Sequence, residues 1–315
     1  MLEQTGKQMA HPHFGPTRLV RASSLSTPGR DVYLKLETEL PTGSFKVRGA
    51  VHALSVNLSK GGVRSVVAAS TGNHGAAVAY AGRQLGVPAV IFLPTNPNPV
   101  KAARIRDLGA TLVETGVDLS AAIDAARAHA TSQSGAFFLH DAEDPDIPAG
   151  TAEIGREVVQ QLPTVEAIYV PMGDTALIRG VASAAKRFRP SIRIIGVVAE
   201  QAPAYCLSWR KGGVVETDTA NTIADGLAVR RPLAPNVDAI RELVDDIEVV
   251  SEREMLAAIA RLHFHEHVTA EPAGAAATAA WLKRAGPERT TVLLVTGMNI
   301  APEVMETVRR DFQIG

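Results

Sequence analysis

Short apolar runs alternate with alanine-rich segments of helical periodicity in the first half of the chain. Runs rich in Val, Ile, Leu and Phe predict strands at residues 63–70, 88–94, 110–115 and 136–140. Apolar residues at spacings of three and four predict helices between these strands, at residues 74–86, 98–109 and 118–133. Gly86 and Gly109 stand at expected helix C-caps, and Asp118 at an expected N-cap. Four strands joined by three helices predict parallel pairing with right-handed crossovers.

A second series of the same kind follows. We expect strands at residues 166–171, 192–199, 246–251 and 290–297, and helices near 175–188, 252–266 and 272–284. These strands are continuously apolar, which is typical of a sheet covered by helices on both faces. The pattern therefore predicts an α/β protein of two parallel-sheet halves, with the binding site in a cleft between them.

Composition narrows the class of ligand. The 315 residues carry 32 basic and 33 acidic side chains, so a net charge of -1 gives no electrostatic reason to expect nucleic acid or an anionic membrane as partner. The longest uncharged stretch, residues 65–82, contains too many polar residues and glycines for a membrane span. Cys206 is the single cysteine, and residues 1–16 lack the basic start and apolar run of a signal peptide. We therefore expect a cytoplasmic enzyme with a small-molecule substrate.

Three stretches carry candidate chemistry. "ASTGNHG" (69–75) and "PMGDTALIRG" (171–180) each join a strand to a helix, and the free N–H groups of a helix N-terminus bind anions. "TGSFKVRGA" (42–50) places Lys46 at the expected start of another helix, where the positive end of the dipole would lower the pKa of the amine and favour a nucleophile. Singly, such a lysine is more often a solvated first-turn residue, and such a turn is more often without a ligand.

In this order the stretches resemble the fold-type II pyridoxal phosphate enzymes, within them the serine/threonine dehydratase (ammonia-lyase) group, which includes serine racemase. The resemblance rests on "KLETELPTGSFKVRGA" (35–50), "ASTGNHGAAVAYAGRQLG" (69–86), "TIADGLAV" (222–229), "AEPAGAA" (270–276) and "LLVTGMN" (293–299). Lysine-type cysteine synthases of the same fold usually carry a "GGSVKDR"-like stretch, so "TGSFKVR" favours the dehydratase branch.

The resemblance implies a fold like that of the tryptophan synthase β-subunit. The large, cofactor-binding domain would comprise residues 1–51 and 144–315, and a small, mobile, substrate-side domain residues 52–143. The active site would lie in the cleft between the domains. Relatives of this kind are commonly homodimers, and we expect one here.

The resemblance also implies roles for individual residues. Lys46 would bind pyridoxal 5'-phosphate as a Schiff base and act in catalysis. Phe45 and Asn73 would lie beside the ring, and Thr296 would place a neutral hydroxyl against the pyridine nitrogen. A ring nitrogen that stays largely unprotonated suits prompt elimination better than a long-lived carbanion. Glu271 is expected beside the cofactor as a structural residue rather than as a general base.

The residues expected around the substrate carboxylate are Ser70, Thr71, Asn73 and His74. Thr71 is also the second catalytic candidate, because racemases of this group have a serine at the matching position, on the face opposite the lysine.

The phosphate loop departs from the family pattern, which is usually four glycines followed by leucine. This chain has Met172, Gly173, Asp174, Thr175 and Ala176 before Leu177. A carboxylate pointing inward would repel a phosphate. We therefore expect Asp174 to turn away and cap the helix, while the N–H groups of residues 173–177 and the Thr175 hydroxyl bind the phosphate.

Two possible metal sites are weak. Racemase-like relatives hold a divalent cation with a glutamate and an aspartate six residues on, but here Glu200 is followed by Cys206. His263 and His267 are one helical turn apart without a third ligand nearby, and histidines are also favoured at a helix C-terminus. No metal is expected at either site.

The sequence therefore predicts a pyridoxal phosphate-dependent dehydratase that converts a β-hydroxy amino acid such as threonine or serine to a 2-oxo acid and ammonia. One alternative is a serine-type racemase, although the extra methyl group of Thr71 crowds that face. The altered 172–176 loop and the segment around Trp209 leave open a less common substrate, such as hydroxyaspartate or phenylserine. The altered loop is also the sole support for a non-catalytic, ligand-binding relative.

Overall fold

The computed structural model describes residues 14–312. Most of the N-terminal stretch on which the expectation about a signal peptide rests lies outside these residues. Within the described part, every helix is too short or too polar to cross a bilayer.

The larger of two sheets has six strands in the order β1-β2-β10-β7-β8-β9. Its strands are β1 (Leu19–Arg21), β2 (Asp31–Leu36), β7 (Ala167–Pro171), β8 (Arg193–Ala199), β9 (Asp246–Val250) and β10 (Thr290–Val295). All neighbouring strands pair in parallel except β1, which lies antiparallel to β2 at one edge. The carboxyl ends of five strands therefore meet at the same edge of this sheet.

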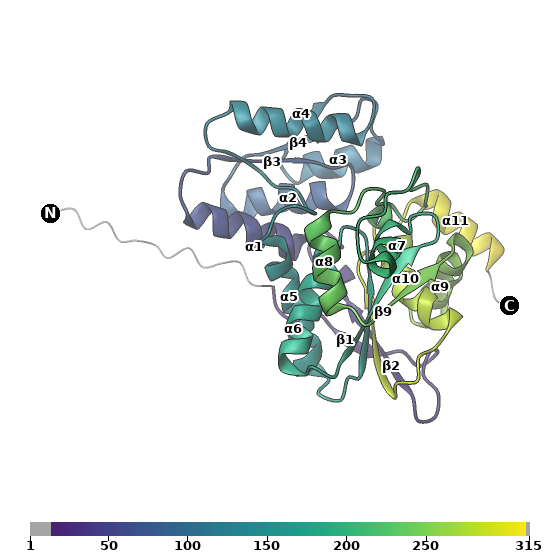
Figure 1. The fold of residues 1–315 in the computed structure, drawn as a ribbon. Helices are drawn as coiled ribbons and strands as arrows, with labels where there is room; N and C mark the ends of the chain where they lie inside the picture. The colour runs from purple at the N-terminus through teal and green to yellow at the C-terminus, as the bar shows by residue number, and fades with distance from the viewer. Residues whose placement is uncertain (1–13, 313–315) are drawn as a thin grey trace.

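The smaller sheet has four parallel strands in the order β5-β4-β3-β6. Its strands are β3 (Ser65–Ala69), β4 (Ala89–Leu93), β5 (Thr111–Glu114) and β6 (Ala136–Phe138). Figure 1 shows this sheet with its helices as a separate layer above the six-stranded sheet. The two parallel-sheet halves predicted from the sequence are thus confirmed.

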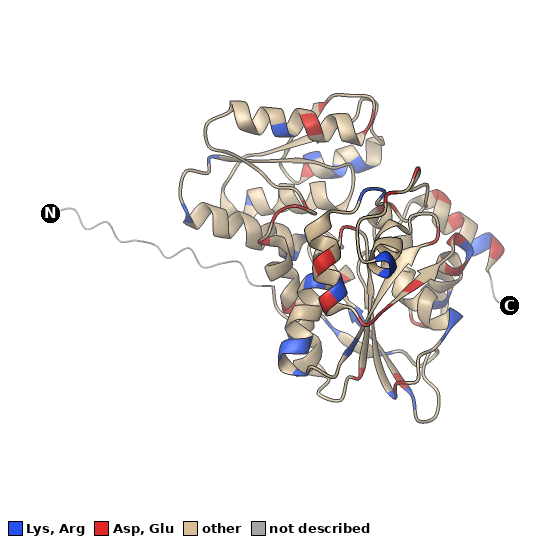
Figure 2. Ribbon diagram, viewed as in Figure 1, with Lys and Arg blue, Asp and Glu red and all other residues tan. Residues whose placement is uncertain are grey.

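Helices cover both sheets (Figure 1). They are α1 (Lys46–Ser59), α2 (Asn73–Leu85), α3 (Pro99–Asp107), α4 (Leu119–Ser132), α5 (Ile147–Gln161), α6 (Ala176–Phe188), α7 (Ala204–Lys211), α8 (Ala234–Leu243), α9 (Glu252–His265), α10 (Pro272–Lys283) and α11 (Pro302–Asp311). Short 3-10 turns lie at η1 (Glu37–Glu39) and η2 (Asp225–Leu227). In Figure 2, basic and acidic residues are interspersed over both layers.

Each strand and helix predicted from the two series is present, with its ends within two residues of the predicted ones. The predicted caps are confirmed as well: Gly86 and Gly109 have φ values of 70° and 93°, and the Asp118 side chain accepts a hydrogen bond from the Ala121 N–H.

Several other elements were not predicted. These are β1, β2, α5, α7, α8 and α11. In β2, the pattern "DVYLKL" is broken by Lys35, whose side chain is completely buried.

A buried network of charged groups explains why a lysine occupies this strand. The Lys35 Nζ donates to the Thr17 carbonyl (2.8 Å), to Glu157 Oε2 (2.6 Å) and to Gln161 Oε1 (2.9 Å). Arg48 donates to both Glu37 and Glu157 through four hydrogen bonds of 2.7–3.0 Å. Two buried cations therefore face two buried carboxylates, and the network joins β2, η1, α1 and α5.

Replacing Lys35 by methionine tests this network. The variant keeps the apolar stem but leaves Glu157 with a single cationic partner and removes the three hydrogen bonds that Lys35 donates. Because an incompletely paired buried charge is costly, we expect Lys35→Met to lower the free energy of unfolding by about 3–5 kcal/mol.

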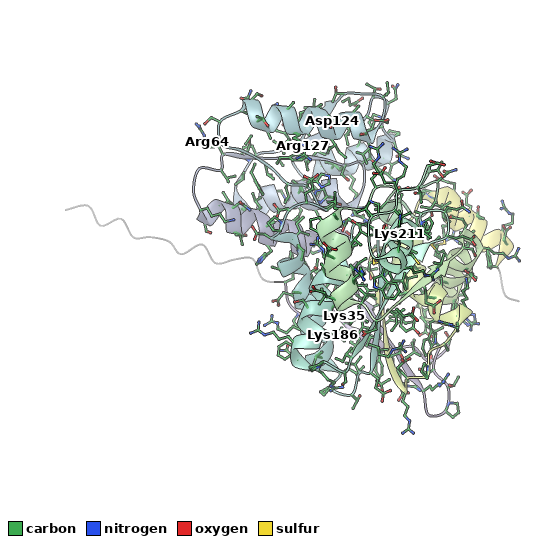
Figure 3. The ribbon with its side chains drawn as sticks, in the orientation of Figure 1. Lys35, Arg64, Asp124, Arg127, Lys186 and Lys211 are labelled. Atoms are coloured by element: carbon green, nitrogen blue, oxygen red, sulfur yellow. The ribbon has the colours of Figure 1, made fainter. Side chains whose placement is uncertain are left out.

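The measurement is urea denaturation, with Lys211→Met as the control, since Lys211 is exposed at the end of α7. Figure 3 labels both lysines. Equal losses of stability in the two variants would contradict the role given to the network.

Candidate active site

Lys46 is the first residue of α1, as the sequence predicts. The segment before it is fixed to the end of β10: the Phe45 N–H donates to the Thr296 carbonyl (3.0 Å), and Ser44 forms a β-bridge with Gly297. These backbone contacts place the start of α1 at the carboxyl edge of the larger sheet, where parallel sheets bind ligands.

The Lys46 ammonium lies between the two halves of the protein. Its Nζ is 2.9 Å from Oδ2 of Asp141, which follows β6 in the smaller sheet. It also contacts Oδ2 of Asp174, which follows β7 in the larger sheet. The Phe45 ring centroid lies 5.3 Å from the same nitrogen, and the lysine side chain is only 11% exposed. The amine predicted to bind the cofactor is thus covered and doubly paired.

The predicted lowering of the Lys46 pKa is wrong for this arrangement. Burial does lower the pKa, but the Asp141 and Asp174 carboxylates outweigh burial, so the pKa is raised. Burial alone would raise the pKa of Asp141, but Lys46, His74 and His140 hold it well below its usual range. Two full charges at contact distance exceed the half charge of a helix end.

The loop between β7 and α6 also differs in part from expectation. The Asp174 Oδ1 accepts a hydrogen bond from the Ala176 N–H (2.9 Å), so the expected capping is present. Asp174 does not turn away, however, because its other oxygen contacts Lys46. Sequence reasoning omitted this attraction between the aspartate and the lysine.

Thr175 has a φ of 74°, a left-handed conformation that is unfavourable for a β-branched residue. It is 1% exposed, and its hydroxyl makes no hydrogen bond with any described residue. At Gly173, an added Cβ would lie 2.0 Å from the Gly226 carbonyl oxygen, so only glycine fits. The loop thus brings a covered, unpaired hydroxyl to the start of α6.

These features fit a phosphorylated aldehyde. The backbone of residues 173–177 forms the turn into a helix N-terminus, and the unpaired Thr175 hydroxyl can donate to a phosphate oxygen. The Lys46 amine, a group that can react with an aldehyde, contacts Asp174 of the same loop. Ala176 and Leu177 are both buried at the first turn of α6.

On the other side of the site, hydrogen bonds connect three polar side chains. The Asn73 Nδ2 donates to Glu271 Oε1 (2.6 Å), and the Asn299 Nδ2 donates to Asn73 Oδ1 (2.6 Å). A Cβ at Gly297 would lie 2.2 Å from Glu271 Oε1, so the chain after β10 passes close to this cluster. Burial raises the pKa of Glu271 to about 7, although the bond from Asn73 opposes the rise.

The predicted carboxylate-binding residues lie where β3 ends and α2 begins. The Ser70 hydroxyl accepts from the Gly72 N–H (3.2 Å), and Thr71 is partly exposed. His74 is buried with its Nε2 3.0 Å from the Leu139 carbonyl oxygen, and burial lowers its pKa. Thr296 is buried at the end of β10 and contacts Phe45 through its backbone.

Two residues of the site were not predicted. Asp141 follows the strand predicted at residues 136–140, and the rule that ligand-binding side chains follow parallel strands would have found it. Asn299 closes the quoted stretch "LLVTGMN", but its bond to Asn73 depends on a contact between distant segments.

The two weak candidate metal sites are not part of a ligand cluster in the part of the chain that the structure describes. Among residues 14–312, no group of three or more His, Cys, Asp or Glu side chains is arranged to hold an ion. Cys206 is buried in α7, where burial raises the pKa of its thiol. His263 lies in the last turn of α9, whereas His267 lies beyond the end of that helix.

The two-sheet fold with a buried lysine between its halves defines a class of α/β enzymes, and comparison with known proteins identifies the family. The family model "Pyridoxal-phosphate dependent enzyme" matches residues 10–297, and the chain belongs to this family. The fold and the cofactor predicted from the sequence are thereby confirmed.

Two curated relatives are similar over most of their length. An L-threonine ammonia-lyase of Geobacter sulfurreducens is 37% identical over 93% of this chain and 73% of that protein. A catabolic L-threonine dehydratase of Escherichia coli is 35% identical over 86% of this chain and 83% of that protein.

Two solved structures are also similar. The processed form of threonine deaminase isoform 2 from Solanum lycopersicum has a TM-score of 0.88 at 30% identity, covering 95% of this chain and 88% of that one. Maize serine racemase has a TM-score of 0.87 at 27% identity, covering 94% and 92%.

The raised pKa of Glu271 predicts a pH-dependent stability. Between pH 4.5 and about 7 this carboxyl stays protonated in the folded chain but ionises in the unfolded chain, so ionisation favours unfolding increasingly as the pH rises. Glu271→Gln removes this effect and keeps an oxygen that can accept from Asn73.

Relative to wild type, we expect the variant to gain about 1–3 kcal/mol of stability on going from pH 4.5 to pH 8. Denaturation of the cofactor-free proteins at several pH values measures this gain. A difference between the proteins that stays constant with pH would contradict the raised pKa.

Proposed function

We propose that this protein is a pyridoxal phosphate-dependent ammonia-lyase that converts threonine or serine to a 2-oxo acid and ammonia. The observation that best supports this proposal is the position of Lys46, at the start of α1 and between the two halves of the protein. The chain is also 37% identical to an L-threonine ammonia-lyase. Both the catabolic dehydratase and the plant threonine deaminase support the same reaction class.

In this proposal the cofactor supplies an aldehyde for amines and an aromatic ring that withdraws electrons from the substrate α-carbon. The N–H groups of residues 173–177 and the Thr175 hydroxyl would hold its phosphate. Phe45 and Asn73 would flank the ring, with Thr296 at the ring nitrogen. Glu271 would orient Asn73 through the 2.6 Å bond between them.

Lys46 would remove the α-proton of the substrate in its neutral form, because its amine lies at the centre of these groups. The ammonium that Asp141 and Asp174 stabilise in the cofactor-free chain would therefore have to lose its proton first. Ser70, Thr71 and His74, with the N-terminus of α2, would bind the substrate carboxylate and fix the α-carbon in front of the lysine. Departure of the β-hydroxyl leaves an enamine, which water hydrolyses to the 2-oxo acid and ammonia.

The two aspartates around Lys46 favour a neutral side chain in the substrate. Asp141 and Asp174 add two negative charges to the site, and a second carboxylate on the substrate would be repelled by both. This argues for threonine or serine over hydroxyaspartate. Phenylserine is not distinguished by charge, and a panel of β-hydroxy amino acids tests it directly.

We further propose that residues 52–143 form a domain that closes over the substrate and excludes water. Two contacts of α3 already cross to the other half: Lys101 pairs with Asp225 (2.5 Å), and Arg104 donates to the Thr42 carbonyl (2.5 Å). We still expect a cytoplasmic protein, on the grounds of its composition. We also expect a homodimer, because relatives of this kind are commonly dimers.

A serine-type racemase is the second candidate function, supported by the similarity to maize serine racemase. Thr71 argues against it, since the threonine methyl would crowd the position from which a second hydroxyl must exchange the proton on the opposite face.

The covalent role proposed for Lys46 leads to a prediction for a variant that lacks this lysine. We expect purified wild type to show the visible absorbance of a bound cofactor and to release 2-oxo acid from threonine or serine. Lys46→Ala should lose the absorbance and at least about 1000-fold in kcat, because both the covalent link and the base are removed. The control is Lys60→Ala, an exposed residue at the other end of α1.

A wild-type protein that stays colourless with added cofactor and releases no 2-oxo acid would instead support the non-catalytic relative.

Thr71→Ser separates elimination from racemisation. We expect the smaller hydroxyl residue to raise the rate of serine racemisation relative to 2-oxo acid release by about tenfold or more. Chiral chromatography of the recovered serine measures one rate, and the 2-oxo acid assay measures the other. Inversion faster than 2-oxo acid release in the wild type would overturn the order of the two functions.

A further inference from the structure

We infer that Arg179 is an additional ligand for the cofactor phosphate and compensates for the aspartate that this chain carries in its phosphate loop. The inference rests on the proposed position of the phosphate at residues 173–177 and extends it to a residue outside that loop.

Arg179 lies one helical turn after the loop. Its N–H donates to the Thr175 carbonyl (2.9 Å) in the first turn of α6. Side chains on a helix tilt toward its N-terminus, so the guanidinium is directed back toward the loop. Its interactions with the charge of Asp174 and with Tyr205 agree with this direction.

Two of the three guanidinium nitrogens are covered but not satisfied. The Nε and Nη2 atoms of Arg179 are buried and make no hydrogen bond within residues 14–312. Leaving such donors unpaired away from water is costly, and the cost is greater for a charged group. The Thr175 hydroxyl is buried and unpaired in the same way one turn earlier. Two buried groups at the start of α6 therefore lack an acceptor among residues 14–312.

Neighbouring side chains do not supply this acceptor, because they are already engaged. Asp174 uses one carboxylate oxygen for the Ala176 N–H and the other for Lys46. The Tyr205 hydroxyl oxygen accepts from the Leu233 N–H (3.2 Å) and from Asn236 (3.3 Å). An oxyanion at the start of α6 would pair with both Thr175 and Arg179. Arginine is suited to phosphate because its planar group donates two parallel hydrogen bonds.

The balance of charges around the loop also favours a contact between Arg179 and the phosphate. A loop of glycines presents only N–H groups to a phosphate dianion, whereas Asp174 adds a negative charge beside it. Lys46 neutralises that charge through direct contact, but an imine formed with an aldehyde would hold its proton less strongly than this ammonium does. Arg179 cannot lose its charge in this way, so it is the permanent cation available to the phosphate and Asp174 together.

The test compares two ligands that differ only in the phosphate. Cofactor-free protein is titrated with pyridoxal 5'-phosphate and with pyridoxal, and imine absorbance gives both dissociation constants. For Arg179→Gln, we expect binding of pyridoxal 5'-phosphate to weaken at least tenfold and binding of pyridoxal to change less than twofold. Arg179→Lys should lie between wild type and Arg179→Gln. Arg187→Gln, an exposed position on the same helix, should match the wild type.

A second variant tests the compensation. Because Arg179 offsets Asp174, Arg179→Gln should weaken pyridoxal 5'-phosphate binding less in an Asp174→Asn background than in the wild type. If Arg179→Gln does not fold, as circular dichroism would show, Arg179→Lys and Asp174→Asn decide the matter. In that case, the inference would be overturned if Arg179→Lys bound pyridoxal 5'-phosphate as tightly as the wild type and Asp174→Asn bound it no more tightly than the wild type.

The inference would also be overturned if Arg179→Gln weakened the binding of both ligands equally, or weakened the binding of neither. These outcomes differ from failure of the proposed function, in which the wild type itself would bind neither ligand as an imine.

Discussion

The position of Lys46 depends on a buried network of four charges. Arg48, two residues after Lys46, is held by Glu37 and Glu157, and Lys35 completes the set from β2. Buried charges need well-defined geometry to offset their loss of solvation, so the network allows α1 one orientation. That orientation directs Lys46 toward the aspartates that follow β6 and β7. Stability and chemistry are therefore coupled through the first turn of a single helix.

Much of the fold could be predicted from the sequence because its strands and helices have clean periodicity. The runs of Val and Ile in β7, β8 and β10 indicate buried parallel strands, and Gly86 and Asp118 mark helix ends through local geometry. The strand β2 could not be found in this way, because buried Lys35 is stabilised by partners more than a hundred residues away. A local pattern carries no information about such partners.

In the candidate site, too, local features could be predicted from the sequence and contacts between distant residues could not. The position of Lys46 at a helix start and the turn at residues 173–177 followed from the sequence. The protonation of Lys46 did not, because it depends on Asp141 and Asp174, which approach from different sheets. Likewise, the hydrogen bonds between Asn73 and its partners Glu271 and Asn299 join residues 198 and 226 positions apart. Interactions between side chains that meet only after folding are the part that periodicity and spacing cannot supply.

The backbone at Thr175 has a consequence for how this protein would respond to selection. A threonine at a φ of 74° costs about 1–2 kcal/mol relative to glycine, which adopts this conformation without strain. Selection for heat resistance alone would therefore favour glycine at this codon. In the proposed function the Thr175 hydroxyl binds the cofactor phosphate, so selection for cofactor retention would keep this group, and the two pressures would oppose each other at one residue. Evolved thermostable variants that accept glycine here would be expected to gain half-life at high temperature while needing more cofactor in the medium.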